Sequence, residues 1–163
     1  ELTGVYFADA GQYIENRLLV DHAVPNCRSN VLYKGALQGD KASKLPEART
    51  CWVGDVLIRA EAKGTDTYET NRNLVLTDGA RADAIPNLEI ETGEIAGAGH
   101  AATVGRFDDD QLFYLRSRGI REEDATRLII RGFFNEVLNQ IPVESIREEL
   151  IARVAGELER NEN

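Results

Sequence analysis

The chain has 163 residues, 42% of them hydrophobic, which suits one folded core with an appendage and excludes global disorder. Its formal net charge is −9, and no block of basic residues interrupts the acidic ones, which argues against nucleic acid or an anionic membrane as the main partner. No apolar run approaches the roughly 20 residues that span a bilayer. No secretory signal is visible, so we expect a cytoplasmic protein.

Residues 1–107 contain a series of short β-favouring runs that Gly, Asn, Asp or Pro residues separate. No helical period lasts beyond a turn or two, which leaves no room for helical crossovers between parallel strands. The pattern is therefore typical of a sandwich, a barrel or a solenoid. The runs are Val5–Phe7, Arg17–Val20, Asn30–Tyr33, Cys51–Val53, Asp55–Ile58, Asn73–Leu76 and Leu88–Ile90.

A weak internal echo favours the solenoid. Asn30–Ala36 and Asn73–Ala80 each contain an Asn, an apolar run and a Gly-Ala turn, and their first residues are 43 positions apart, which would suit two turns of a coil. Asparagines beside the runs predict left-handed corners, because Asn tolerates that conformation. These are Asn16, Asn30, Asn71, Asn73 and Asn87. We favour a parallel β-helix, with a β-sandwich as the alternative.

Residues 38–50 are polar and include Gly39 and Pro46, so we expect an exposed loop between two strands. The two cysteines, Cys27 and Cys51, have no CxxC or metal-binding spacing. We expect free, buried thiols in a reducing compartment, with a disulfide or a ligand role as the alternative.

The hydrophobic period changes to a helical one at Asp108. Asp108 predicts an N-cap, Gln111 stands at the capping-box position, and Gly119 predicts the end of this first helix. The tripeptide Asp108–Asp110 is better explained by a helix N-terminus than by a divalent cation.

A second helix should begin near Arg121 or Glu122 and end before Pro142, and a third should run from Glu144 to Arg160. Residues 161–163 should fray. The predicted division is therefore a β core over residues 1–107 and a helical domain over residues 108–163.

His22 and His100 are the two histidines. His22 precedes a Pro25-Asn26 turn and predicts a surface or hydrogen-bonded side chain. Small residues surround His100 and leave its imidazole approachable, so it could ligate a metal, titrate near neutrality or meet a partner, with a structural role as the alternative. No nucleophile elbow, phosphate-binding loop, HExxH motif or dinucleotide fingerprint is present.

Three stretches resemble the SufB/SufD family of iron–sulfur cluster assembly proteins. Residues 13–35 are similar to a coil that ends in a Ser-containing corner and a Lys, and residues 65–90 to an Asn-rich coil followed by a Pro-x-Leu-Glu-Ile strand. The most specific stretch is 97–120, with Gly99-His100 and the segment Gln111–Ile120. Ala101 resembles SufD, because SufB-type chains carry a carboxylate after the histidine. Family members are much longer, so we expect a C-terminal portion.

The resemblance implies a right-handed parallel β-helix followed by a small C-terminal helical domain, acting as a non-catalytic scaffold. It implies pairing with a SufB-like subunit at the end of the β-helix, with contacts at Ala98, Gly99, Ala101 and Thr103. His100 matches a proposed ligand of a transient iron–sulfur cluster at that junction, and no tightly bound cofactor is expected. Ala98 stands where SufD-type members often have a cysteine, so the thiolates would come from the partner.

The resemblance also implies that the helices hold a SufC-like ABC ATPase, and we select Arg116, Arg118, Phe133 and Phe134 for that contact. Two alternatives stay open from the residues alone. One is a carbohydrate-active β-helix lyase or hydrolase, and the other is a structural module that forms homodimers through its exposed β-edges.

Overall fold

The computed structural model describes residues 1–42 and 44–160. The chain divides into two compact units, of which the first is Glu1–Arg106 and the second begins at Phe107. The division falls one residue before the predicted boundary between residues 107 and 108.

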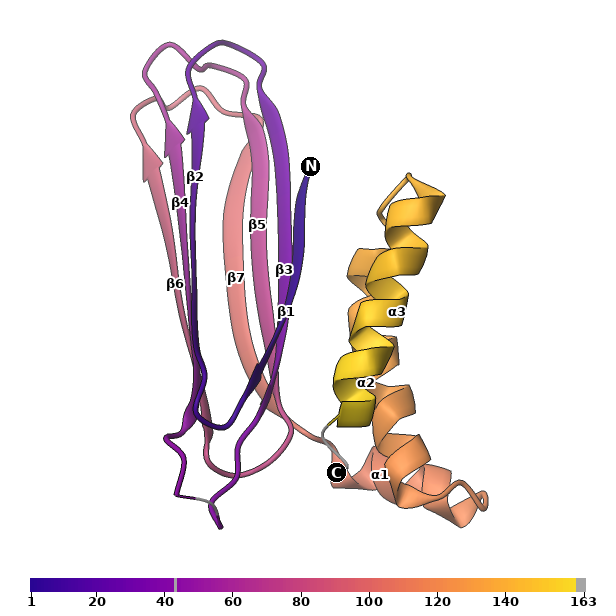
Figure 1. Cartoon of the computed structure of the whole chain (residues 1–163). Coiled ribbons are helices and arrows are strands. Elements are labelled where there is room, and N and C mark those ends of the chain that lie inside the picture. Colours follow the sequence, from indigo (N-terminus) through magenta and orange to yellow (C-terminus); the bar gives the residue numbers. More distant parts are fainter. Residues whose placement is uncertain (43, 161–163) are drawn as a thin grey trace. The chain divides into compact units, whose positions relative to one another are not determined.

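The first unit is a parallel β-solenoid, as predicted (Figure 1). One sheet contains four strands in the order β1-β3-β5-β7, and the other contains three in the order β2-β4-β6. The chain alternates between the two sheets, so each coil adds one strand to each. The strands are β1 (Leu2–Asp9), β2 (Tyr13–His22), β3 (Arg28–Gln38), β4 (Ala48–Ile58), β5 (Asp66–Val75), β6 (Ala80–Ile90) and β7 (Gly97–Arg106).

The register contradicts the internal echo that we used to predict the coil. Asn30 pairs with Tyr68, and Asn73 pairs with Gly35, so the two Asn-containing segments are not aligned. Successive coils have corners of different length, such as the long segment 39–47 between β3 and β4. A fixed sequence spacing therefore does not mark the turns of this solenoid.

The strands have 8 to 11 residues and are longer than the hydrophobic runs. Ladder pairing continues through polar positions, since backbone groups rather than side chains make the hydrogen bonds. All five asparagines expected at corners lie within strands instead. Left-handed backbone occurs instead at Asn26, with φ 60°, and at Gly11, Gly64 and Gly79 in the β unit, so the prediction was wrong for all five asparagines. Asn71 and Asn73 are buried and bond to each other, whereas Asn30 and Asn87 donate to the carboxylates of Glu1 and Asp55.

The core lies between the two sheets and combines apolar and polar side chains. Trp52 and Ile58 are fully buried, and the ring of Tyr33 lies 6.1 Å from that of Trp52. Next to them the Tyr6 hydroxyl donates to Asn73 Oδ1 at 2.6 Å, and Asn71 Nδ2 donates to the Tyr6 hydroxyl at 3.0 Å. Burial raises the pKa of Tyr6 to about 12. This network is the polar part of the solenoid interior.

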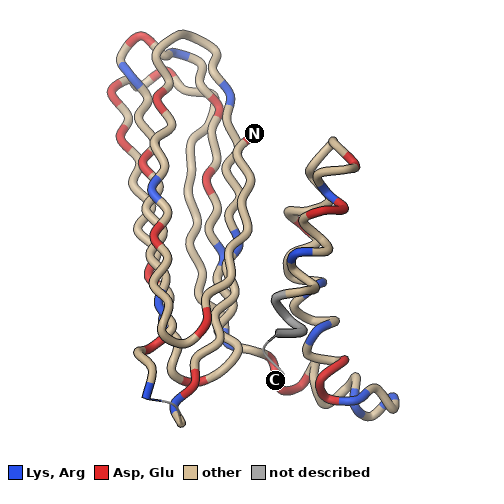
Figure 2. The backbone as a smooth tube through the Cα atoms, in the orientation of Figure 1, with Lys and Arg blue, Asp and Glu red and all other residues tan. Residues whose placement is uncertain are grey.

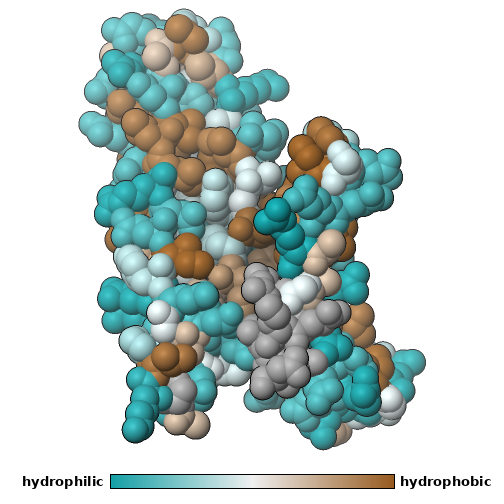
Figure 3. All heavy atoms as spheres, viewed as in Figure 1, coloured by the Kyte–Doolittle hydropathy of each residue, from teal (hydrophilic) through white to brown (hydrophobic). Residues whose placement is uncertain are grey.

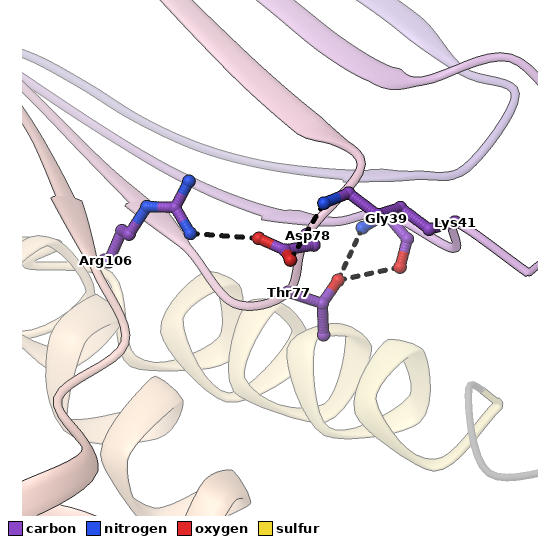
Figure 4. Close-up of polar contacts among 5 residues, drawn as sticks. All are labelled: Gly39, Lys41, Thr77, Asp78 and Arg106. Atoms are coloured by element: carbon purple, nitrogen blue, oxygen red, sulfur yellow. Dashed lines mark hydrogen bonds and ion pairs between the residues drawn. The ribbon is translucent and has the colours of Figure 1, made fainter.

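At one end of the solenoid, hydrogen bonds and ion pairs connect neighbouring corners (Figure 4). Thr77 Oγ1 accepts from Gly39 N at 2.8 Å and donates to Gly39 O at 2.7 Å. The neighbouring Asp78 binds Lys41 Nζ at 2.9 Å and Arg106 at 3.0 Å. These contacts hold Gly39 and Lys41 of the predicted loop, which is shorter than residues 38–50 because β4 begins at Ala48, and they fix the last residue of β7 beside the β5–β6 corner.

The second unit contains α1 (Asp109–Ser117), α2 (Glu122–Leu138) and α3 (Glu144–Arg160), close to the predicted bounds. Asp108 caps α1 by accepting from Asp110 N and Gln111 N. Gly119, with φ 85°, follows the end of α1 as expected. The predicted fraying of residues 161–163 concerns positions outside the described residues. Figure 2 shows acidic and basic residues interspersed over the described part of both units.

Candidate functional site at the open edge

The solenoid ends in two strands that each lack a neighbour on one side. Among the described residues, β7 pairs with β5 alone, and β6 pairs with β4 alone. In this part of the chain the backbone N–H and C=O groups on the outer side of these two strands have no ladder partner. Such an edge can pair with another chain.

The residues predicted at the SufB side lie on β7 but face opposite ways. Ala98 packs against the buried cluster of Val56, Ile58 and Ala62, so it points into the solenoid. Side chains alternate along a strand, which places His100 on the same inward face and the other three on the outer face. Those three are Gly99, Ala101 and Thr103. The predicted residues therefore all lie on the edge strand β7, but they do not form one surface of it.

His100 remains exposed although it faces inward, because no strand formed by the described residues covers it on the open side. Gly99 has a separate steric role on the outer face. A Cβ atom at Gly99 would lie 2.8 Å from Cε2 of Tyr68, which is the register partner of Gly99 in β5. The glycine thus lets the half-exposed Tyr68 ring lie against β7.

Glu69 is the residue of this end that the sequence prediction missed. It lies on β5 and pairs in register with His100 on β7, so it is one strand further from the open edge than His100. Its side chain is only 1% exposed. Its carboxylate lies close to Gly54 and to the ring of Trp52. Burial, with a smaller contribution from Asp55, raises the pKa of Glu69 to about 7. The sequence carried no signal for this residue, because Thr67–Asn73 is polar at nearly every position and only the burial pattern of the strand shows which side chains face inward.

The described residues contain no group of three or more His, Cys, Asp and Glu side chains that could hold a metal ion. Cys27 and Cys51 are free and half-buried, and Cys27 Sγ donates to Val24 O at 3.1 Å. His100 supplies one imidazole at the open end. A cluster bound there would need further ligands from a second protein, because tetrahedral iron in such clusters takes mostly thiolates.

His22 has the hydrogen-bonded structural role that we expected. It is 4% exposed, and its Nε2 lies 3.0 Å from Ser29 Oγ, which in turn lies 2.5 Å from Thr67 Oγ1. Burial lowers the pKa of His22, which favours the neutral ring.

The residues selected for ATPase docking differ in exposure. Arg116 forms an ion pair with Glu122 at 3.1 Å, and Arg118 donates to the Tyr114 hydroxyl at 2.8 Å. Phe133 is half-buried, and Phe134 is only 1% exposed, so Phe134 has no free surface for a partner.

Four large apolar side chains of the helices are exposed, and the sequence prediction did not select them for docking. They are Phe113, Tyr114, Leu128 and Ile146. Figure 3 shows hydrophobic residues among hydrophilic ones on the visible face. No helix in the described residues is long and apolar enough to cross a membrane.

Fold and edge together define the class of protein: a parallel β-solenoid with an open last coil that continues into a helical segment. Sequence comparison identifies the family within this class. The family model described as "SUF system FeS cluster assembly, SufBD core domain" matches residues 1–133. The chain belongs to the SufBD family.

Known relatives agree with this assignment. An iron–sulfur cluster assembly SufBD family protein of Mycobacterium tuberculosis is 70% identical over 163 residues, which are 100% of this chain and 41% of that protein. The SufD protein of Escherichia coli is 35% identical over 144 residues, 88% of this chain and 32% of that protein. A different SufBD family protein of Mycobacterium bovis is 30% identical over 144 residues, 88% of this chain and 16% of that protein. The chain thus spans less than half the length of these relatives.

Proposed function

We propose that this chain belongs to a SufD-like, non-catalytic scaffold subunit for iron–sulfur cluster assembly in the cytoplasm. The observation that carries the proposal is the open edge of β7 with His100 on it. An edge of this kind is an aggregation hazard unless it is covered, and pairing with a partner strand covers it. Membership of the SufBD family favours cluster assembly over a carbohydrate-active enzyme.

The partner at β7 is a second SufBD protein of the SufB type. Mycobacterium bovis has one SufBD family protein at 70% identity to this chain and another at 30%. Two divergent members in one organism support a heteromeric pair rather than a homodimer, because a pair of unlike subunits requires two distinct sequences.

His100 contributes an imidazole ligand to a cluster that forms transiently between the two subunits. Imidazole is an established ligand of iron in [2Fe–2S] centres of the Rieske type. Ala98 stands two residues before His100, in the place of the cysteine that SufD-type members often have, so the thiolates come from the partner. The cluster is cargo here and not a resident cofactor.

The helices bind a SufC-like ABC ATPase. Phe113 and Tyr114 on α1 and Leu128 on α2 are large apolar side chains that stand exposed, as docking residues must. Arg116 on α1 and Arg118, the residue that caps its C-terminal end, can supply charged contacts at the rim of the surface.

The test is co-purification of the full-length protein with its SufBD partner and the ATPase. Deletion of residues 121–163 should abolish recovery of the ATPase and leave pairing with the SufBD partner intact. Undiminished recovery of the ATPase would contradict docking through the helices. His100→Ala should assemble normally but hold little iron under anaerobic isolation, and wild-type iron in that variant would contradict the ligand role.

A further inference from the structure

Glu69 and His100 stand next to each other on the inward face of the first sheet. They are register partners in β5 and β7. Hydrogen-bonded strands lie about 4.8 Å apart, and a matched parallel register keeps paired side chains on one face. Thr67 and Asn71, two positions before and after Glu69, are also buried, whereas Tyr68 is exposed. Glu69 therefore lies beside His100 on the inward face, on the strand next to the last one.

The carboxylate of Glu69 is buried without a bonding partner. Among the described residues, neither of its oxygens accepts a hydrogen bond. An orphaned buried polar group costs about 1–3 kcal/mol, and native proteins retain few of them. Packing does not require a carboxylate here, because the residue beneath Glu69 in the same column is the apolar Val31. The Glu69 oxygens are therefore acceptors whose hydrogen-bonding capacity the described residues leave unused.

The surroundings of Glu69 make room for this carboxylate. Gly54 on β4 faces it across the solenoid, and a Cβ atom at Gly54 would overlap both the Glu69 carboxylate and the Trp52 ring. His100, in contrast, has no strand beyond it and is exposed. The pair thus combines a confined acceptor with an exposed imidazole.

A histidine that ligates a metal through one ring nitrogen usually donates its other N–H to a carboxylate, a backbone carbonyl or a water. This hydrogen bond sets the ring orientation and raises the basicity of the ligand nitrogen. Glu69 is the carboxylate that the register places beside His100.

We propose that Glu69 is a positioning residue for His100: its carboxylate accepts one imidazole N–H and directs the other ring nitrogen toward the iron of a cluster at the open end. The inference rests on the ligand role of His100 proposed above. Glu69 itself does not bind the iron, since it lies on β5, one strand further from the open edge than His100.

The test uses the full-length protein in complex with its SufBD partner and the ATPase, loaded anaerobically with ferrous iron and sulfide. Two properties are measured: the iron affinity of the complex, and the imidazole nitrogen coupling in the pulsed EPR spectrum of the reduced cluster. Glu69→Leu removes both acceptor oxygens at similar volume, and Glu69→Gln keeps one of them. Asn71→Leu is the matched control, because it removes a buried polar group whose register partner is Ala102.

We expect Glu69→Leu to lower iron affinity about 10- to 100-fold and to change the nitrogen coupling, as loss of an outer-shell partner does. Glu69→Gln should fall between this variant and the wild type, and Asn71→Leu should keep the wild-type coupling. Wild-type affinity and coupling in an assembled Glu69→Leu complex would overturn the inference, and loss of both in His100→Ala would then leave the ligand role standing. An unaffected His100→Ala complex would overturn both. If Glu69→Leu fails to assemble, the smaller Glu69→Ala is tested, with the same two outcomes.

Discussion

At the scale of single residues, this solenoid differs from an apolar core in the polar side chains that fill part of its interior. Tyr6, Asn71 and Asn73 satisfy one another, whereas Glu69 has no such partner. A satisfied buried network is stabilising or neutral, and an unsatisfied group costs stability. The two cases predict different responses to substitution.

Asn73→Ala should lower the free energy of unfolding by about 1–3 kcal/mol, because it leaves the buried Tyr6 hydroxyl without its acceptor. The same substitution also removes the donor to Asn71 Oδ1, which lies 2.6 Å away. Urea unfolding measures the change. Asn87→Ala is the control, since the exposed Asn87 amide donates to Asp55 and its loss should cost less than about 0.5 kcal/mol. Equal losses in the two variants would contradict a structural role for the network.

The stability of the solenoid should fall as pH rises from about 4.5 to about 7. The pKa of Glu69 lies above its ordinary value of 4.5, at about 7, so the native state binds this proton more tightly than the unfolded state. The stabilisation by the proton is complete below about pH 4.5 and lost above about pH 7, and amounts to at most about 3 kcal/mol.

The measurement is urea unfolding at several pH values, comparing the wild type with Glu69→Gln. Asp55, the other carboxyl group that acts on the pKa of Glu69, is common to both proteins, so the difference between the two pH profiles isolates Glu69. Parallel profiles would show that Glu69 ionises normally in the folded chain.

At the scale of elements, the helices were predictable and the strands were only partly so. Helix ends depend on local signals, and the caps at Asp108 and Gly119 lie where the sequence predicted them. Strand length and register depend on pairing with residues far away in sequence. The hydrophobic runs therefore located the strands without showing their full length, and the echo between Asn30 and Asn73 was misleading.

Packing between the two sheets yields a third prediction. Gly54→Ala should destabilise the solenoid by about 1–3 kcal/mol, because the added methyl group would overlap the Glu69 carboxylate and the Trp52 ring. Glu69→Ala should relieve part of this cost, so the double variant should be more stable than the sum of the single effects predicts. Gly93→Ala, where the methyl group meets nothing within 4 Å, is the control. Additive effects of the two substitutions would contradict direct contact between these positions.

At the scale of the whole molecule, the site was predictable only as far as its strand. His100 stood out because small residues surround it and because the stretch 97–120 resembles the SufB/SufD family. Glu69 is 31 positions earlier in the chain, and only the register of β5 with β7 brings the two together. Phe134 was selected for its size and hydrophobicity, but those properties also favour burial, and the structure buries it.

The central claim is that β7 is the edge through which this subunit meets a second SufBD protein. Amide hydrogen exchange of the full-length protein, with and without that partner, tests it most directly. We predict that amides of β7 (Gly97–Arg106) slow by at least about 10-fold in the complex, while those of the central strand β4 (Ala48–Ile58) stay equally protected in both states. A complex that forms without any slowing of exchange in β7 would contradict the account.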